Sequence, residues 1–420
     1  MQEYGEQKMR MYIDPGTGSM LFTILIGVIG VAFYSVRMLF IKLRYKIGGG
    51  KSVAALKKIP FVVFSDDKRY FKIFEPVLRE LSRRGKEVLY LTGSEDDPAF
   101  SSDIEGLQAE CIGKDNKSFT KLNFLNATIL LSTTPGLDVY QWKRAKDVDC
   151  YVHMLHAASE VTLYRMFGID YYDAILLSGD YQAKDIRTLE SLRSLPEKEL
   201  HMIGIPYMDE MAKRLAKEGP APEHPRTVLL APTWGKSGIF SVYGGRILDV
   251  LLKTGYHIIV RPHPQSFESE TELMDKLMKE YPASEQLEWN RDTDNFDVLR
   301  RSDILISDFS GVIFDFALIN DKPVIYTDPD FDISLYDAWW MDTPLWTTSA
   351  LPRLGAELTE DNMEDLKTLI DTCIEDPKYA ESRSQVKDET WAYRGDGAVR
   401  AADYLIAKYD ELTSEKGGKK

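Results

Sequence analysis

Two short polar stretches directly follow apolar, strand-like runs in the C-terminal part of the chain. The first is RPHP (261–264), which comes after the run HIIV (257–260). A guanidinium and an imidazole held between two prolines of fixed φ can bind an anion with little reordering, so Arg261 and His263 are candidate phosphate contacts. The same sequence could form a stiff turn with a surface histidine, and the pattern alone favours neither interpretation.

The second stretch, SDFSG (307–311), lies between the apolar run DILIS and the helical pattern GVIFDFALIN. Asp308 or Ser310 could cap that helix, whose first N–H groups would form an anion site, and Gly311 would let a ligand approach the backbone closely. The simpler interpretation is an ordinary helix cap without a ligand. Asp315 lies on an otherwise apolar helix and needs a partner, either the sugar hydroxyls of a nucleotide or a neighbouring backbone group.

A third candidate group ends the strand-like run CYVHMLH (150–156). Strand alternation places His153 and His156 on opposite faces, so at most one of them faces a cleft. A histidine in that position could act as a general base near neutral pH, although a single histidine at a strand end is more often structural.

The chain offers no clear metal or cofactor site. The sequence DTD (292–294) imitates the metal-binding acid pair of some nucleotide-sugar enzymes, but it precedes NFDVLRR and is predicted to cap a helix. No set of His, Asp or Glu has metal-ligand spacing, and neither a GxxxxGK[ST] nor a GxSxG motif occurs. We therefore expect neither a metal nor a cofactor.

Strand-like and helical patterns alternate along most of the chain, which favours parallel sheets covered on both faces. A stretch rich in proline, glycine and charge (216–227) interrupts the alternation, and the pattern then restarts. We predict an α/β fold with two Rossmann-like parallel-sheet domains, 60–220 and 225–345, facing a cleft. C-terminal helices (346–413) and a disordered tail (414–420) are expected to follow. Ligands of such sheets bind beyond the carboxyl ends of the strands, where the polar stretches lie.

The N-terminal region contains the apolar segment Met20–Ile41, followed by a basic stretch without acids. Its length suits one transmembrane helix, and the positive charge after it places the catalytic part in the cytoplasm. The prediction is a short extracytoplasmic N-terminus (1–19), a single-pass cell-membrane anchor (20–41) and a basic juxtamembrane linker (42–59). A buried hairpin or an interfacial helix is the alternative, because Arg37 interrupts the apolar run.

Charge and cysteine content exclude other classes of protein. The formal net charge is −14, although residues 37–58 carry seven Lys or Arg and no acid, so the rest of the chain is more acidic still. Such a body is a poor nucleic-acid binder. Three cysteines far apart argue against a disulfide scaffold and suit a reducing compartment.

Taken together, LLAPTWG (229–235), RPHP and DILISDFSGVIFDFALINDKPVIY (303–326) resemble the CDP-glycerol glycerophosphotransferase family, the teichoic-acid primases and polymerases. GIPYMDE (204–210) and DGAVRAADYL (396–405) are weaker likenesses. The chain departs from the family pattern around His156, where Leu155 and Ala157 replace Trp and Gly. It also has Gly235 in place of an arginine after APTW, and Gly311 in place of a second serine.

The resemblance implies a GT-B architecture and transfer of an alditol phosphate from CDP-glycerol, or a related CDP-alditol, to a hydroxyl of a lipid-linked acceptor, with release of CMP. It implies that His156 is the base and that His263 contacts the pyrophosphate. Further substrate contacts would come from the remaining motif residues, Thr233, Ser307, Asp308, Ser310, Gly311 and Asp315.

Two other functions remain open at this point. A GT-B glycosyltransferase that uses a nucleotide sugar for surface polysaccharide synthesis would need the same phosphate site. A non-catalytic membrane protein that kept the donor fold would explain the altered surroundings of His156. The sequence gives neither the alditol nor the acceptor, and it does not exclude a homo-oligomer.

Overall fold

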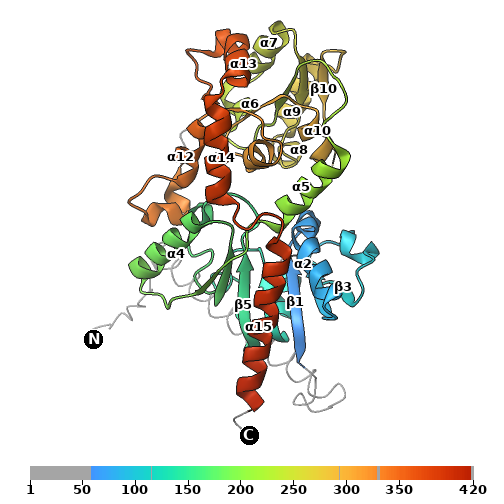
Figure 1. Ribbon diagram of the computed structural model, residues 1–420, viewed down its shortest axis with the longest axis vertical. Helices are drawn as coiled ribbons and strands as arrows, with labels where there is room; N and C mark the ends of the chain where they lie inside the picture. Colours follow the sequence, from blue (N-terminus) through green and yellow to red (C-terminus); the bar gives the residue numbers. More distant parts are fainter. Residues whose placement is uncertain (1–57, 115, 293, 329–331, 418–420) are drawn as a thin grey trace, which may run out of the picture. The chain divides into compact units, whose positions relative to one another are not determined.

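The computed structural model describes residues 58–114, 116–292, 294–328 and 332–417 (Figure 1). The predicted membrane anchor and the first part of the basic linker lie outside these residues. Within the part of the chain that the structure describes, no helix is both long enough and apolar enough to cross a bilayer.

The first half of the chain contains a seven-stranded sheet in which every neighbouring pair of strands is parallel. The strand order is β3-β2-β1-β4-β5-β6-β7, a doubly wound arrangement whose direction of winding reverses between β1 and β4. The strands are β1 (Ile59–Ser65), β2 (Val88–Thr92), β3 (Leu107–Cys111), β4 (Asn126–Ser132), β5 (Asp147–Met154), β6 (Ala174–Leu177) and β7 (Glu199–Met202).

Helices connect these strands and cover the sheet. They are η2 (Lys68–Tyr70), α2 (Phe71–Arg83), η3 (Pro98–Ser101), α3 (Asn116–Leu122), η4 (Val161–Leu163), α4 (Asp180–Arg193) and α5 (Pro206–Glu218). Sequence sets several of their ends: α5 begins with a proline, which has no N–H to leave unpaired, and a glycine of positive φ follows its last residue.

The second half repeats the arrangement with six parallel strands in the order β10-β9-β8-β11-β12-β13. The winding reverses between β8 and β11. The strands are β8 (Thr227–Leu230), β9 (His257–Val260), β10 (Leu287–Trp289), β11 (Ile304–Ser307), β12 (Val324–Tyr326) and β13 (Gly355–Glu357). The helices between them are α6 (Ile239–Tyr243), α7 (Arg246–Lys253), α8 (Ser266–Ser269), α9 (Thr271–Glu280), α10 (Phe296–Arg300), α11 (Val312–Phe314) with the π-helical turn η5 (Asp315–Ile319), η6 (Ile333–Leu335), η7 (Asp337–Trp340) and α12 (Trp346–Leu354).

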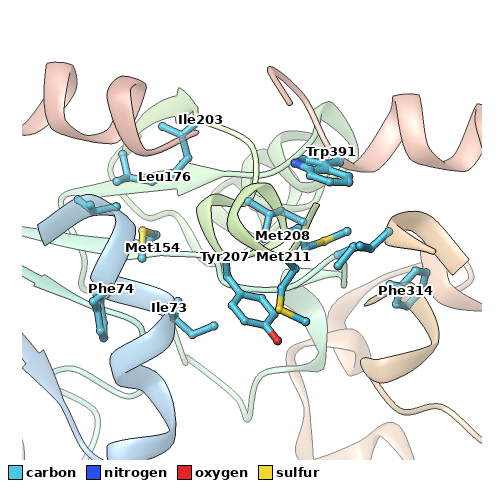
Figure 2. Packing of buried hydrophobic residues seen from close by; sticks show 14 of the residues in the cluster. Ile73, Phe74, Met154, Leu176, Ile203, Tyr207, Met208, Met211, Phe314 and Trp391 are labelled. Atoms are coloured by element: carbon cyan, nitrogen blue, oxygen red, sulfur yellow. The ribbon is translucent and has the colours of Figure 1, made fainter. Parts of the chain in front are cut away.

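Both faces of each sheet are buried, as the nearly continuous apolar runs of the strands require. In β1, Phe61 and Val63 belong to one core cluster, while Val62 and Phe64 belong to another. One cluster continues from the first half into the second. Figure 2 shows Ile73 and Phe74 of α2 near the α5 side chains, with Phe314 of α11 on the other side of α5. Helix α5 therefore packs against both halves.

The chain returns to the first half at its C-terminus. Helices η8 (Met363–Asp365), α13 (Leu366–Glu375) and α14 (Lys378–Thr390) follow β13, whereas α15 (Gly397–Gly417) packs on α2 and β4 of the first sheet (Figure 1). Where the chain crosses back to the first half, the backbone at Ala392 lies directly against Gly204. A Cβ at Gly204 would collide with the carbonyl oxygen of Ala392, and the φ of Gly204 is +85°.

Asp209 fixes the same crossing. Its carboxylate accepts hydrogen bonds from Trp391 Nε1 at 2.8 Å, Gly395 N at 2.7 Å and Gly397 N at 2.9 Å. The two weaker family likenesses, GIPYMDE and DGAVRAADYL, therefore contact each other, and the role of Asp209 is structural.

Two Rossmann-like parallel-sheet halves confirm the predicted α/β fold. Two short strands were not predicted: β3 at the edge of the first sheet and β13 at the edge of the second. The C-terminal helices do not form a separate group, since α13 packs on the second sheet and α15 on the first. All three cysteines are free, and Cys150 and Cys373 are buried.

Candidate active site

The residues proposed to bind phosphate lie where the winding of the second sheet reverses. The loop after β8 (231–238) and the loop after β11 (308–311) leave neighbouring strands at their carboxyl ends. This is the position at which doubly wound sheets bind ligands.

Asp308 holds the two loops together. Its carboxylate is fully buried and accepts hydrogen bonds from Thr233 N, at 3.1 and 2.9 Å for the two oxygens, and from Ile239 N at 3.3 Å. Burial raises the pKa of Asp308 to about 6, and the backbone donors only partly oppose this rise. The prediction that Asp308 or Ser310 caps the following helix is wrong, because no side chain caps α11. Asp308 shapes the loop after β8 instead.

Ser307 and Thr233 also make internal contacts. The Ser307 hydroxyl is buried and donates to the Ala231 carbonyl at 2.6 Å, which links β11 to the loop after β8. The Thr233 hydroxyl donates to the Trp234 carbonyl at 3.2 Å. Both residues shape the site, and the Thr233 side chain remains partly exposed.

Gly311, at the N-terminus of α11, is exposed, and nothing lies within 4 Å of the position that a Cβ would occupy. Its φ of −56° is ordinary for any residue. Neither the backbone nor the packing of the protein therefore requires glycine here. A ligand that approaches the first N–H groups of the helix would require it.

Asp315 begins the π-helical turn η5, a rare conformation that is frequent at functional sites. Burial raises its pKa to about 6, while the charge of Lys72 and a hydrogen bond from Asn295 oppose the rise. Tyr207 of α5 joins this polar group, since its hydroxyl donates to Asn295 Oδ1 at 3.3 Å and accepts from Lys72 Nζ at 3.4 Å. Asp315 thus has side-chain partners from both halves.

Arg261 and His263 follow β9, as predicted. The guanidinium of Arg261 donates to Asn290 Oδ1 and, at 2.7 Å, to the Asp292 carbonyl, so the side chain is oriented by the loop after β10. His263 Nδ1 accepts from Gln265 N at 3.1 Å, which leaves Nε2 to carry the proton of the neutral ring. Burial and the charge of Arg69 lower the pKa of His263, so the neutral form prevails at pH 7.

One cavity of about 700 Å³ brings residues of the two halves together. Arg261, His263 and Ser310 line it from the second half. Five cationic side chains line it in all, against the carboxylates of Glu75 and Asp103; the cations are Lys68, Arg69, Lys72, Arg79 and Arg261. Lys68, Arg69 and Arg79 form ion pairs with carboxylates in or beside the cavity. Lys72 and Arg261 form no ion pair with another described residue, and their positive charge makes this cavity a candidate anion site.

His156 lies on the first half, just beyond β5. Its Nδ1 is 2.5 Å from Thr133 Oγ1, and the ring of Tyr70 meets its ring edge-to-face at 5.4 Å between centres. Burial lowers the pKa of His156 to about 4, so the ring is neutral at pH 7. His156 is not among the described residues that line the 700 Å³ cavity.

His153, three residues earlier, lies in the core. Its side chain is fully buried, Nε2 is 3.1 Å from the Tyr164 hydroxyl, and burial lowers its pKa to about 3. The strand ends at Met154, so His156 lies in the loop beyond it and strand alternation does not place its side chain. His156 is partly exposed, whereas His153 is buried.

A second cavity of about 1060 Å³ adjoins the first and shares Lys68, Arg69 and Pro264 with it. It lies against the loops that follow β1, β2 and β3, and residues of both signs line it. Besides these three shared residues, both cavities contain residues that follow strands of the first sheet.

Several lining residues were not predicted. Lys68, Arg69 and Lys72 follow β1 in the sequence SDDKRYFK, and Asn295 follows the acidic stretch before α10. The sequence did contain an indication of these residues, because polar residues that follow β1 lie at the reversal point of the first sheet. Asp294 accepts a hydrogen bond at 3.1 Å from the N–H of Phe296, the first residue of α10, while Asn295, the residue directly before the helix, makes no side-chain cap. Among the described residues, no group of three or more His, Cys, Asp or Glu could hold a metal ion.

The sequence pattern of one family, CDP-Glycerol:Poly(glycerophosphate) glycerophosphotransferase, matches residues 169–405, more than half of the chain. The chain belongs to this glycerophosphotransferase family. The match covers Arg261, His263 and the loop 307–311, and it confirms the resemblance inferred from these motifs. The chain is accordingly a transferase of the CDP-glycerol glycerophosphotransferase type. A comparison with curated protein sequences found no match.

Solved structures confirm the GT-B-like fold of this glycerophosphotransferase. The wall teichoic acid polymerase TagF, in a variant soaked with CDPG, matches 84% of this chain and 89% of its own with 18% identity and a TM-score of 0.53. A putative UDP-N-acetylglucosamine 2-epimerase from Listeria monocytogenes matches 85% and 98% with 12% identity and a TM-score of 0.56. MnaA from S. aureus with UDP matches 85% and 98% with 11% identity and a TM-score of 0.54.

Proposed function

We propose that the protein transfers glycerol phosphate, or a related alditol phosphate, from a CDP-alditol to a hydroxyl of a lipid-linked acceptor, releasing CMP. One observation carries the proposal. The cavity lined by Arg261, His263 and Ser310 has an excess of cations in an acidic chain, and it lies at the reversal point of the sheet that the family match covers. The fold relative TagF, soaked with CDPG, is in keeping with this donor.

The second half would hold the donor. A pyrophosphate in the cavity could accept a hydrogen bond from His263 Nε2–H and ion-pair with Arg261, while the open backbone at Gly311 admits an oxygen to the helix N-terminus. These donors stabilise the charge that develops on the leaving CMP as the bond to the β-phosphorus breaks. Asp315, flanked by Asn295, suits hydroxyls of the nucleotide better than phosphate, because like charges repel.

The first half would hold the acceptor. His156 is neutral at pH 7 and so can accept the proton of the attacking hydroxyl, provided that Nδ1 donates to Thr133 and leaves Nε2 free. Arg69 and Lys72 of the first half line the cavity together with Arg261 and His263 and can neutralise the transferred phosphoryl group.

A membrane location of the enzyme, with its catalytic part in the cytoplasm, belongs to the same proposal. It rests on the apolar segment Met20–Ile41 and the basic residues that follow it. An anchor would confine the enzyme to the surface that carries a lipid-linked acceptor.

Release of CMP tests the proposal. Membranes containing the full-length protein are incubated with CDP-glycerol or CDP-ribitol and a lipid-linked acceptor extract. We expect turnover with one CDP-alditol, and we expect His263→Gln to lower kcat/KM by about tenfold or more, equivalent to about 1.4 kcal/mol. His257→Gln, which changes a histidine of the same half outside the cavity, serves as the matched control.

Two outcomes would contradict the proposal. The first is no CMP release with any CDP-alditol across acceptors. The second is tighter binding of UDP- or GDP-sugars than of CDP-alditols in a thermal-shift titration, which would favour a GT-B glycosyltransferase. Turnover that is unchanged in both His156→Ala and His263→Ala would contradict the assigned roles alone.

A further inference from the structure

A group of large apolar side chains lies exposed around the end of α4. It has six members, with exposed fractions from 37% for Phe167 to 62% for Trp339: Phe167, Tyr171, Leu192, Leu335, Trp339 and Trp340. These residues are named the aromatic face here. Single exposed apolar residues are normal, but an exposed apolar patch drawn from three chain segments marks an interaction surface. None of the six lines either cavity, so the aromatic face is separate from the candidate active site.

The aromatic face is built on a buried ionic network. Arg193, the last residue of α4, donates to Asp170 Oδ1 at 2.8 Å and to Asp337 Oδ1 at 2.5 Å, and all three side chains are almost fully buried. The same guanidinium lies 4.8 Å from the ring centre of Phe167 and 5.1 Å from that of Trp340. Buried ion pairs are weak contributors to stability, because desolvation offsets their attraction. This network fixes two exposed rings in place.

The backbone conformation of Phe167 also indicates that its exposed ring is held in place. Phe167 has a φ of 68°, a left-handed conformation that bulky residues rarely adopt and that persists only where surrounding contacts impose it. Asp337 imposes it, since its carboxylate accepts from Phe167 N at 2.8 Å. A further bond, from Met166 N to the Leu335 carbonyl at 3.2 Å, ties the two segments together. The fold thus holds Phe167 in an unfavourable backbone conformation although its ring is not buried.

The residue types suit one kind of partner. Tryptophan and tyrosine are enriched where bilayers meet water, because an apolar ring carries a polar edge, and phenylalanine and leucine insert alongside them. Arg165 is exposed in the same segment and adds a cation that phospholipid head groups attract.

We propose that the aromatic face is the surface by which the folded body lies on a lipid bilayer, with Leu335, Trp339 and Phe167 at head-group depth. The length of chain ahead of the body favours lipid over a protein partner. The apolar segment ends at residue 41, and residues 42–58 span at most about 60 Å, so a body tethered there stays beside the membrane. Tethering raises the effective concentration of the aromatic face at the membrane, so even weak binding of this face to lipid is sufficient to keep it there. The inference rests on the membrane location proposed above, and it does not rest on the proposed transferase activity.

Site-specific fluorescence tests it on the full chain. Cys111→Ser removes the partly exposed thiol, and Cys150 and Cys373 are buried. An environment-sensitive fluorophore is then attached at Leu335→Cys, or at Val242→Cys and Phe100→Cys as exposed controls outside the aromatic face. The chain is reconstituted in phosphatidylcholine vesicles that contain some phosphatidylglycerol, with and without brominated lipid.

We expect brominated lipid to quench the label at 335 several-fold more than the labels at 100 and 242. The quenching should persist at high ionic strength, because insertion of apolar side chains is not screened by salt. In a chain labelled at Leu192→Cys, the substitution Trp339→Ser should reduce quenching. Equal quenching at all three positions, or none at 335, would overturn the inference. So would a label at 335 that responds to protein concentration without lipid, since a second copy of the chain would then cover the face.

Discussion

The substitution Gly311→Ala tests whether the backbone at this position binds a ligand or forms only a structural turn. Gly311 has a φ of −56°, and nothing lies within 4 Å of the position that an added methyl group would take, so alanine fits both the backbone and the space. Replacing glycine by alanine in a compatible conformation removes freedom from the unfolded chain, and the expected gain in the free energy of unfolding is about 0.4–1 kcal/mol. The variant should therefore be at least as stable as the native protein.

Binding should change in the opposite direction. A methyl group at the start of α11 would occupy the approach to its first N–H groups, where the donor phosphate is proposed to lie. We expect affinity for CDP-glycerol to fall about tenfold or more, equivalent to about 1.4 kcal/mol. Urea denaturation and isothermal titration with CDP-glycerol measure the two effects on the same preparation.

Gly255→Ala provides the matched control. Gly255 also has open space around it, but its φ is +77°, so alanine should lower stability by about 1 kcal/mol and leave binding unchanged. If Gly311→Ala binds CDP-glycerol as tightly as the native protein, no ligand closely approaches this backbone, and the placement of the phosphate is refuted.

Three further predictions concern carboxylates and the candidate base. The folded pKa of Asp308, about 6, exceeds its ordinary value of 3.8. Between about pH 4 and 6 the carboxyl ionises in the unfolded chain but stays protonated in the folded protein, so the free energy of unfolding falls by about 3 kcal/mol as pH rises. Asp308→Asn should abolish this loss in denaturation curves between about pH 4 and 8. Asp209→Ala leaves three N–H donors without their acceptor and should lower the free energy of unfolding by about 2–5 kcal/mol in urea. Thr133→Val should reduce kcat about tenfold without changing the KM for CDP-glycerol, because it frees the His156 ring, and Thr133→Ser should restore the rate.

Each of these has a contradicting outcome. Parallel pH curves for native protein and Asp308→Asn would mean that the folded carboxyl has an ordinary pKa. A stability loss below about 1 kcal/mol in Asp209→Ala would show that α15 docks without this carboxylate. A raised KM with unchanged kcat in Thr133→Val would move Thr133 from the base to the substrate.

The alternation of apolar runs and amphipathic stretches predicted both sheets, because buried parallel strands are continuously apolar. It missed β3 and β13 for the same reason. Strand β3 (LQAEC) is an edge strand that alternates between partly buried and exposed residues, and β13 (GAE) has only three residues. Neither resembles the buried strands that the pattern detects.

The site was predicted in part. Placement of Arg261 and His263 after a strand follows from local sequence, whereas the partner of Asp308 does not. Its acceptor oxygens bond a loop about 75 positions earlier, and only the parallel pairing of β8 with β11 brings that loop near. A polar residue after a strand therefore indicates the site without indicating its own role. The cations after β1 also follow a buried apolar run, but no family motif distinguishes SDDKRYFK from an ordinary polar loop, and so they were missed.

The return of α15 to the first sheet governs the order in which the protein can be completed during synthesis. Phe61 in β1 packs on Tyr409 of α15, with 5.1 Å between ring centres, so the first strand of the body is covered by the last helix that the structure describes. Domains usually fold as they leave the ribosome, N-terminal one first. Here the second half can fold while the first still exposes part of its core. A stop codon before Trp391 would therefore damage the half of the protein that was made first.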